Sequence, residues 1–293
     1  MKAFGNYHPF VLMVYFLALL LVAMFATNPV LQLLALLGGV AFAAVTAKKG
    51  ERLSDCVFYL FMFFLVAVTN PLFSHNGVTP LFFLNGNPVT LEAFVYGFDI
   101  AVAINGVMLW CKCYSAIITS EKFLYLFGKT IPKLSLILSM ALKFVPSFKQ
   151  QLKRVKNAQK AMGFYSSKSY TDRVKSAVRV FTAMIAWSME NAVETSNSMR
   201  ARGYGLKGRS HFSLFRFSGR DGALLASCTG LLCCVLAAAA FSKLSFYYYP
   251  RISKIPATPG AILAYAAFGI LAFLPVLIEV KESLIWKYYI SKI

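Results

Sequence analysis

Residue types that could do chemistry are few in this chain, and their spacing forms no familiar catalytic or metal site. The three histidines stand singly: His8, His75 and His211. Cys111 and Cys113 form a C-x-C pair without the second pair that a zinc site needs. Gly128-Lys129-Thr130 resembles the end of a phosphate-binding loop, but Phe123 occupies the position of its first glycine. We therefore expect no catalytic residue, no metal and no cofactor.

The most distinctive stretch is 199–205, Met-Arg-Ala-Arg-Gly-Tyr-Gly, where a long helical pattern stops. Gly203 suits the left-handed residue that closes a helix. With Ala201 it would let the helix end approach another surface closely, and Arg202 would be the charged probe. A buried arginine needs an acidic or hydrogen-bonding partner. A weaker copy, Lys-Ala-Met-Gly-Phe, occupies residues 160–164.

These two stretches predict two docking tips for a partner that offers two similar sockets. The alternative is that Ala-x-Gly merely ends each helix, which would be acceptable for the weaker copy alone. We call Lys160, Ala161, Met162 and Gly163 the first tip, and Arg200, Ala201, Arg202 and Gly203 the second tip.

The rest of the composition indicates what must position these tips. The chain has 293 residues, of which 58% are hydrophobic and only 14% charged, which is typical of an integral membrane protein. Apolar runs of near-spanning length cover residues 10–26, 30–47, 56–73, 91–118, 222–241 and 259–280. We predict an all-α, polytopic membrane protein with about six transmembrane helices. Its regions are N-terminal spans (1–119), a basic insert (120–220) and C-terminal spans (221–293).

The charge distribution predicts how this chain lies in a membrane. The net charge is +19, and its basic residues fall between lipid-length runs, which argues against nucleic acid as the partner. Cytoplasmic segments are enriched in Lys and Arg, so the insert and both ends are expected inside a cell membrane. Residues 74–88 lack both and fit an external loop. Lys243, Arg251 and Lys254 would fall outside, against this rule.

Two acids, Glu92 and Asp99, lie seven residues apart inside a predicted span. Charge within a membrane is costly and often functional. Both residues lie in the first turns, however, where an acid suits the helix dipole and can reach water. A structural role is therefore favoured over a functional one.

The insert reads as two long amphipathic helices separated by a polar hinge at residues 165–170. Apolar residues recur every three or four positions, as in the faces of amphipathic helices. On the first helix this face comprises Phe144, Phe148, Leu152 and Val155; on the second it includes Val174, Val178, Phe181, Met184 and Ile185. Glu190 and Glu194 are expected to pair with the basic first helix.

Two other functions remain open from the residues alone. One is a polybasic scaffold, because Lys149, Lys153 and Lys156 form a stripe that anionic headgroups would attract. The other is a membrane-embedded enzyme with a diffuse site that acts on a lipid or isoprenoid.

Residues 125–210 resemble a known family, the transmembrane T component of energy-coupling-factor (ECF) transporters, a branch of the ABC importers. The resemblance rests on Ile131 and Pro132 and on residues 136–146, 158–163 and 194–205. Met162 departs from it, since the family pattern has arginine there. Without that charge, shape and apolar contact, or Lys160, would have to serve the first tip.

The resemblance implies a protein that couples other subunits and performs no chemistry itself. Each tip would seat in a groove of one of two ABC-type ATPase subunits, where ATP is hydrolysed. The apolar helix faces would carry a membrane-embedded, substrate-binding S component. ATP-driven closure would move the helix pair and tip the S component, which would release a vitamin or a metal ion such as cobalt or nickel inward.

Overall fold

The structure is a computed structural model that describes residues 3–46, 50, 52–74, 76–84, 87–128, 131–164, 170–206, 215–241 and 243–290. The chain divides into two compact units. The first, here called the bundle unit, combines Met1–Phe123 with Phe215–Ile293. The second, here called the insert unit, is Leu124–Leu214. The predicted hinge at 165–170 lies outside the described residues except for Tyr170.

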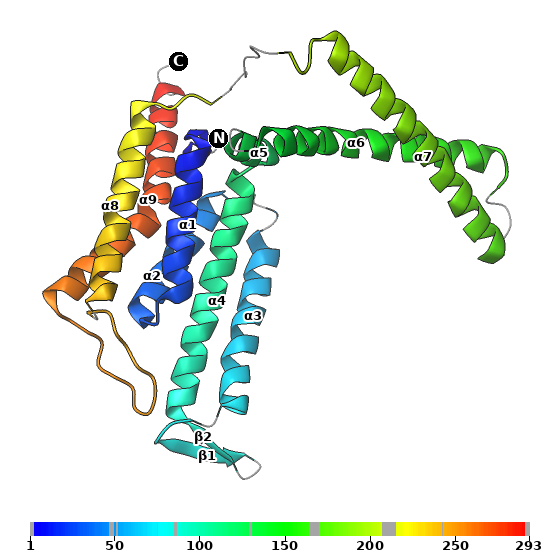
Figure 1. The fold of residues 1–293 in the computed structure, drawn as a ribbon. Coiled ribbons are helices and arrows are strands. Elements are labelled where there is room, and N and C mark those ends of the chain that lie inside the picture. Colours follow the sequence, from blue (N-terminus) through cyan, green and yellow to red (C-terminus); the bar gives the residue numbers. More distant parts are fainter. Residues whose placement is uncertain are drawn as a thin grey trace. The chain divides into compact units, whose positions relative to one another are not determined.

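The bundle unit is built from long apolar helices that run side by side (Figure 1). They are α1 (Pro9–Phe25), α2 (Pro29–Thr46), α3 (Arg52–Phe73), α4 (Leu91–Ile117), α8 (Gly219–Ala240) and α9 (Pro259–Ile290), preceded by a short 3-10 turn, η1 (Phe4–Asn6). All but α1 are long and apolar enough to cross a membrane. The 17 residues of α1 would span about 25 Å, slightly less than a typical hydrocarbon core. The predicted class, an all-α polytopic membrane protein, is confirmed.

The helices alternate in direction, which defines two ends of the bundle unit. At one, here called the charged end, α2 and α4 finish and α3 begins; at the other, here called the hairpin end, α3 finishes and α4 begins. The hairpin end carries β1 (Pro80–Leu84) and β2 (Asn87–Thr90), an antiparallel pair where only a loop was predicted. Thr90 then caps α4 by accepting a hydrogen bond from the Ala93 N–H.

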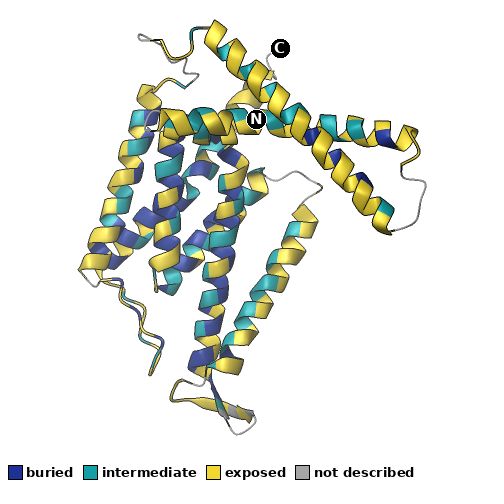
Figure 2. Ribbon diagram, turned by 45° about the vertical axis from the view of Figure 1, so that its right-hand side comes forward, coloured by how far each residue is buried: buried dark blue, intermediate teal, exposed yellow. Residues whose placement is uncertain are grey.

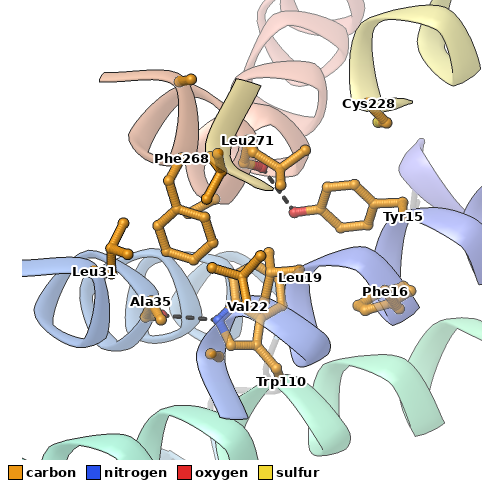
Figure 3. Packing of buried hydrophobic residues seen from close by; sticks show 14 of the residues in the cluster. Tyr15, Phe16, Leu19, Val22, Leu31, Ala35, Trp110, Cys228, Phe268 and Leu271 are labelled. Carbon is orange, nitrogen blue, oxygen red and sulfur yellow. Dashed lines mark hydrogen bonds between the residues drawn. The ribbon is translucent and has the colours of Figure 1, made fainter. Parts of the chain in front are cut away.

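An aromatic core holds α1, α2, α4 and α9 together (Figure 3). Trp110 is fully buried and donates its indole N–H to the Ala35 carbonyl of α2 at 2.8 Å. Tyr15 of α1 is also fully buried and donates its hydroxyl to the Leu271 carbonyl at 3.0 Å. A buried indole or phenol needs such a partner, so both side chains contribute specific contacts as well as apolar area.

Two adjacent glycines let α2 lie unusually close to its neighbours. A Cβ atom added at Gly38 would stand 2.8 Å from the Ala272 Cβ of α9. One added at Gly39 would stand 3.2 Å from the Trp110 indole nitrogen. Small residues at such crossings allow close packing between membrane helices, where apolar burial supplies little driving force.

The residues before α1 are anchored by polar groups of distant segments at the charged end. The backbone N–H of Phe4 donates to Glu279 of α9 at 3.0 Å, and that of His8 to Asp221 of α8 at 2.8 Å. The ammonium group of Lys122 donates to the Gly5 carbonyl at 2.6 Å. These acids satisfy backbone donors that would otherwise lack partners, so they have a structural role.

Glu92 and Asp99 are buried, although we expected both to reach water. Glu92 accepts a 2.7 Å hydrogen bond from the Thr79 hydroxyl of the loop before β1. Asp99 lies beside Tyr248, whose pKa is raised by burial and by that neighbouring carboxyl. The Tyr248 ring also packs 5.1 Å from that of Tyr96. The α8–α9 connection and the hairpin loop thus fold back over both acids, consistent with the structural role.

Candidate docking site

The insert unit is dominated by two crossed helices, α6 (Pro132–Ala161) and α7 (Tyr170–Ala201), visible in Figure 1. A shorter helix, α5 (Ser120–Gly128), precedes them. Val180 and Met184 of α7 and Gln159 of α6 are buried at the contact. The rings of Phe148 and Trp187 meet edge to face at 5.7 Å. The two long helices therefore pack against each other through these side chains.

The first tip ends α6 with a specific backbone closure. Gly163 has φ +78°, a left-handed conformation that suits glycine. Its N–H donates to the Lys160 carbonyl at 3.0 Å, and the Phe164 N–H donates to the Gln159 carbonyl at 3.2 Å. This pair of bonds defines a Schellman motif, with Met162 at the C-cap.

The second tip repeats that closure on α7. Gly203 has φ +77°, and its N–H donates to the Arg200 carbonyl at 2.9 Å. The Tyr204 N–H donates to the Met199 carbonyl at 3.0 Å. Arg202 therefore occupies the same backbone position as Met162. The two tips share one geometry and differ in the side chain that the C-cap presents.

Both C-cap side chains point into open surroundings. Met162 is 62% exposed, and Arg202 is exposed too. Within the part of the chain that the structure describes, no hydrogen bond or ion pair engages the Arg202 guanidinium. A cation at a helix C-terminus also suits the dipole. Lys160 and Arg200, two residues before the C-cap, are exposed, as are Ala161 and Ala201.

The first tip is additionally braced by the start of α7. The Arg179 guanidinium lies 4.0 Å from the centre of the Phe164 ring, a cation–π distance. The Ser176 hydroxyl donates to the Phe164 carbonyl at 3.0 Å. These contacts hold the aromatic residue that follows Gly163 against the other helix, so this tip has a defined orientation within the insert unit.

The predicted helix faces fall into two groups. Phe144, Leu152 and Val155 are half-buried on α6, and Phe148 packs on Trp187. On α7, Val178, Phe181 and Ile185 are exposed, by 57%, 65% and 41%. Figure 2 shows that most residues of both helices are exposed.

Three further residues extend the exposed face of α7. Together they form what we call the α7 stripe: Val174, Val178, Phe181, Ile185, Met189 and Val193. Their spacing of three or four residues keeps them on one side of the helix. The sequence pattern placed Met184 on this same face, but Met184 is buried against α6. Met189 and Val193 were missed, although the same period contains them.

The predicted pairing of Glu190 and Glu194 with α6 is not formed. Both are exposed, and the ion pair found among the described residues joins Lys112 and Asp55 in the bundle unit. Four lysines of α6 instead lie along an exposed groove that comprises Lys149, Leu152, Lys153, Lys156, Asn157 and Lys160.

A bundle of membrane-length apolar helices that carries an inserted pair of exposed, crossed helices defines a class, the multi-pass membrane proteins. The chain belongs to the CbiQ family: the family model, described as "Cobalt transport protein", matches residues 7–213. That match includes both tips and the α7 stripe.

Curated relatives carry the name energy-coupling factor transporter transmembrane protein EcfT. One from Listeria innocua is 25% identical over 222 residues, which cover 64% of this chain and 84% of that protein. One from Lacticaseibacillus paracasei is 32% identical over 108 residues, covering 35% of this chain and 40% of the relative. The predicted resemblance to the ECF transmembrane component is confirmed. These relatives are transporter components, and none is named as an enzyme.

Proposed function

We propose that this chain is the coupling subunit of an ECF-type importer. It transmits the ATP-driven motion of two cytoplasmic ATPases to a membrane-embedded S component, which takes up a vitamin or a metal ion such as cobalt or nickel. The observation that carries this proposal is the repeated closure at Gly163 and Gly203, which presents one exposed C-cap side chain at the end of each helix.

The tips suit docking because the residues on either side of the probe residue are small. Ala161 and Ala201 precede the C-cap, and a glycine follows it, so a groove can close around Met162 or Arg202. An arginine brought into such a groove requires an acidic or hydrogen-bonding wall. Met162 instead favours an apolar wall, and Lys160, two residues earlier, supplies a nearby cation. The two ATPase grooves are therefore engaged by unequal chemistry.

The α7 stripe is the surface that we assign to the S component. It is apolar, and its side chains are exposed in the part of the insert unit that the structure describes. Exposed apolar patches of this kind mark sites of interaction with proteins or membranes. The second tip ends α7, which presents this stripe, and the first tip ends α6, which packs against α7. Motion at the tips would therefore be carried to the S component by rigid helices.

The decisive experiment is Arg202→Glu in the full chain, co-expressed with its ATPases. Reversing a charge that pairs in a desolvated groove costs about 2 kcal/mol or more, so binding should weaken at least about 30-fold. Pull-down from detergent and uptake into vesicles measure the loss. Arg173→Glu, an exposed charge reversal early in α7, is the matched control. Normal co-purification and uptake by Arg202→Glu would refute the docking role.

The first tip is tested by Met162→Arg. If its groove retains an acidic wall, the new arginine should bind as well as Met162 or more tightly in the same pull-down. A severe loss would mean that the groove is apolar and cannot accept charge. In either case the two grooves can be compared directly, because the backbone closures match.

The α6 groove supports a second candidate function, a polybasic contact with anionic lipid. Replacing Lys149, Lys153 and Lys156 with Gln should then reduce vesicle binding at low salt more than Arg202→Glu does. Under the coupling proposal, Arg202→Glu should reduce ATPase binding more than the three lysine replacements do.

A further inference from the structure

A cavity of about 560 Å³ lies within the bundle unit, at its charged end. Its walls come from the last turns of α2, the first turns of α3 and the last turns of α4. The volume falls in the range of small-molecule and cofactor sites. The coupling proposal does not use this cavity, so a ligand bound here can be tested independently of the coupling role.

At the hairpin end α3 packs closely on α4. There, a Cβ atom at Gly97 would stand 2.8 Å from the Ala67 carbonyl, and the Asn70 amide donates to the Ala93 carbonyl at 2.9 Å. Toward the charged end the cavity lies between α3 and α2, with α4 as its third wall. Only 6% of the spanning window of α3 is buried, the lowest share among the candidate spans, and Figure 2 shows α3 in the colours of exposed and intermediate residues along most of its length.

The lining changes from charged to apolar along the helix direction. The mouth carries Arg52, Asp55 and Lys112, and the wall farther in is formed by apolar residues such as Val40, Leu60 and Phe63. From Arg52 to Phe63 the cavity follows α3 for about 16 Å at the standard helical rise. That is about the depth of one leaflet, half of a core of roughly 30 Å.

The charges at the mouth lie on two helices, α3 and α4, and α2 contributes a backbone carbonyl. The Arg52 guanidinium donates to the Ala44 carbonyl of α2 at 2.7 Å, and Lys112 of α4 forms an ion pair with Asp55 of α3. Two cations thus face one carboxylate, which leaves a net positive mouth. Both side chains of the ion pair remain about one-third exposed, so water and headgroups can reach them.

We propose that this cavity binds one anionic phospholipid. Its phosphate contacts Arg52 and Lys112, and one acyl chain lies along Val40, Leu60 and Phe63. Arginine matches the geometry of a phosphate, and basic pockets between membrane helices bind anionic headgroups. An acyl chain fills apolar volume that would otherwise lack contacts. The polarity gradient runs in the direction that a lipid requires, with its charged group at the membrane surface.

The test is native mass spectrometry of the full chain in mild detergent, titrated with phosphatidylglycerol and phosphatidylcholine of identical acyl chains. We expect the wild type to prefer phosphatidylglycerol. Removing each charge, in Arg52→Gln and Lys112→Gln, should reduce that preference about 5-fold, whereas Arg52→Lys should retain most of it. Arg220→Gln removes an exposed cation of α8 outside the cavity and should change nothing. Equal binding of both lipids, or an equal effect of Arg220→Gln, would overturn the proposal.

Two further variants test the acyl-chain site. Ala43→Trp fills the cavity from α2 and should abolish the retained lipid, while Val45→Trp, two residues along and outside the lining, should not. A photoreactive maleimide on Cys56, which lines the cavity, identifies the occupant when Cys56 is the single cysteine kept. Labelled phosphatidylglycerol supports the proposal. Cross-linking to a second membrane protein in its place would refute it.

Discussion

At the scale of single residues, the backbone rather than the C-cap side chain closes each tip. Gly163 and Gly203 have φ values within one degree of each other, although Met162 and Arg202 differ in charge and shape. The closing bonds use only N–H and carbonyl groups. The C-cap residue can therefore change without altering the helix end.

This separation predicts different outcomes for two substitutions of Gly203. Asn tolerates a left-handed conformation and should preserve ATPase binding, whereas Val strongly disfavours it and should open the closure. A Cβ atom there would also meet the Leu206 side chain at 3.1 Å, which a flexible side chain can relieve. Pull-down of the ATPases distinguishes the two. Equal binding by Gly203→Val would show that the closure is unnecessary.

The residue scale also shows what the sequence could predict. Glycine placement identified both helix ends, because a left-handed closure depends on local chemistry. It could not decide which α7 residues face α6. Apolar residues occur on much of that helix, so the period alone grouped buried Met184 with exposed Phe181.

At the scale of elements, membrane-length apolar runs were predicted to within a few residues at most helix ends. The exceptions have physical causes. The last span continues to Ile290, ten residues beyond the predicted end at Val280, because charged residues there do not interrupt the helix. The β1–β2 hairpin was read as a loop, since its Asn, Gly and Pro residues outweigh two short strand segments.

The close approach of α2 to α9 predicts a strong position dependence for Gly→Ala changes. Gly38→Ala would place a methyl group 2.8 Å from the Ala272 Cβ, so overpacking should cost about 1–3 kcal/mol. Gly230→Ala on α8 meets nothing within 4 Å and should gain up to about 1 kcal/mol of helix propensity. In detergent, the melting temperature should therefore fall for Gly38→Ala and rise for Gly230→Ala. Equal shifts would contradict close packing at Gly38.

The α7 stripe predicts a loss of association without a loss of stability. Phe181→Asn removes the ring from an exposed apolar surface and should weaken capture of the S component while leaving the melting temperature nearly unchanged. Ala183→Asn, exposed on another side of α7, is the matched control. Unaltered capture by the Phe181 variant would exclude the stripe as the docking surface.

At the scale of the whole molecule, several contacts that organise the bundle join residues hundreds of positions apart. Phe4 with Glu279 and His8 with Asp221 are examples. No local pattern indicates such pairs, and their acids read in the sequence only as charges near span ends. Membrane class was predictable from composition, whereas the anchoring of residues 4–8 required the folded structure.

The charge distribution predicts opposite sides of the membrane for the hairpin end and the insert unit. In a cysteine-free background, Asn76→Cys should react with an impermeant maleimide in intact cells, because the hairpin end would be external. Ser196→Cys on α7 should react only after permeabilisation. Both positions are exposed, so side-chain burial does not confuse the result. The reverse labelling pattern would invert the proposed orientation.

The two tips share a backbone closure but differ in their C-cap residue, and this affects the orientation in which a partner can bind. A partner made of two non-identical halves would meet two tips of the same backbone shape, one with a cationic and one with a neutral C-cap residue. Shape alone would let it attach either way round, and charge would then reject one arrangement. The difference between Met162 and Arg202 would therefore decide which half of the partner binds which tip. The backbone shape of the two tips would not need to differ.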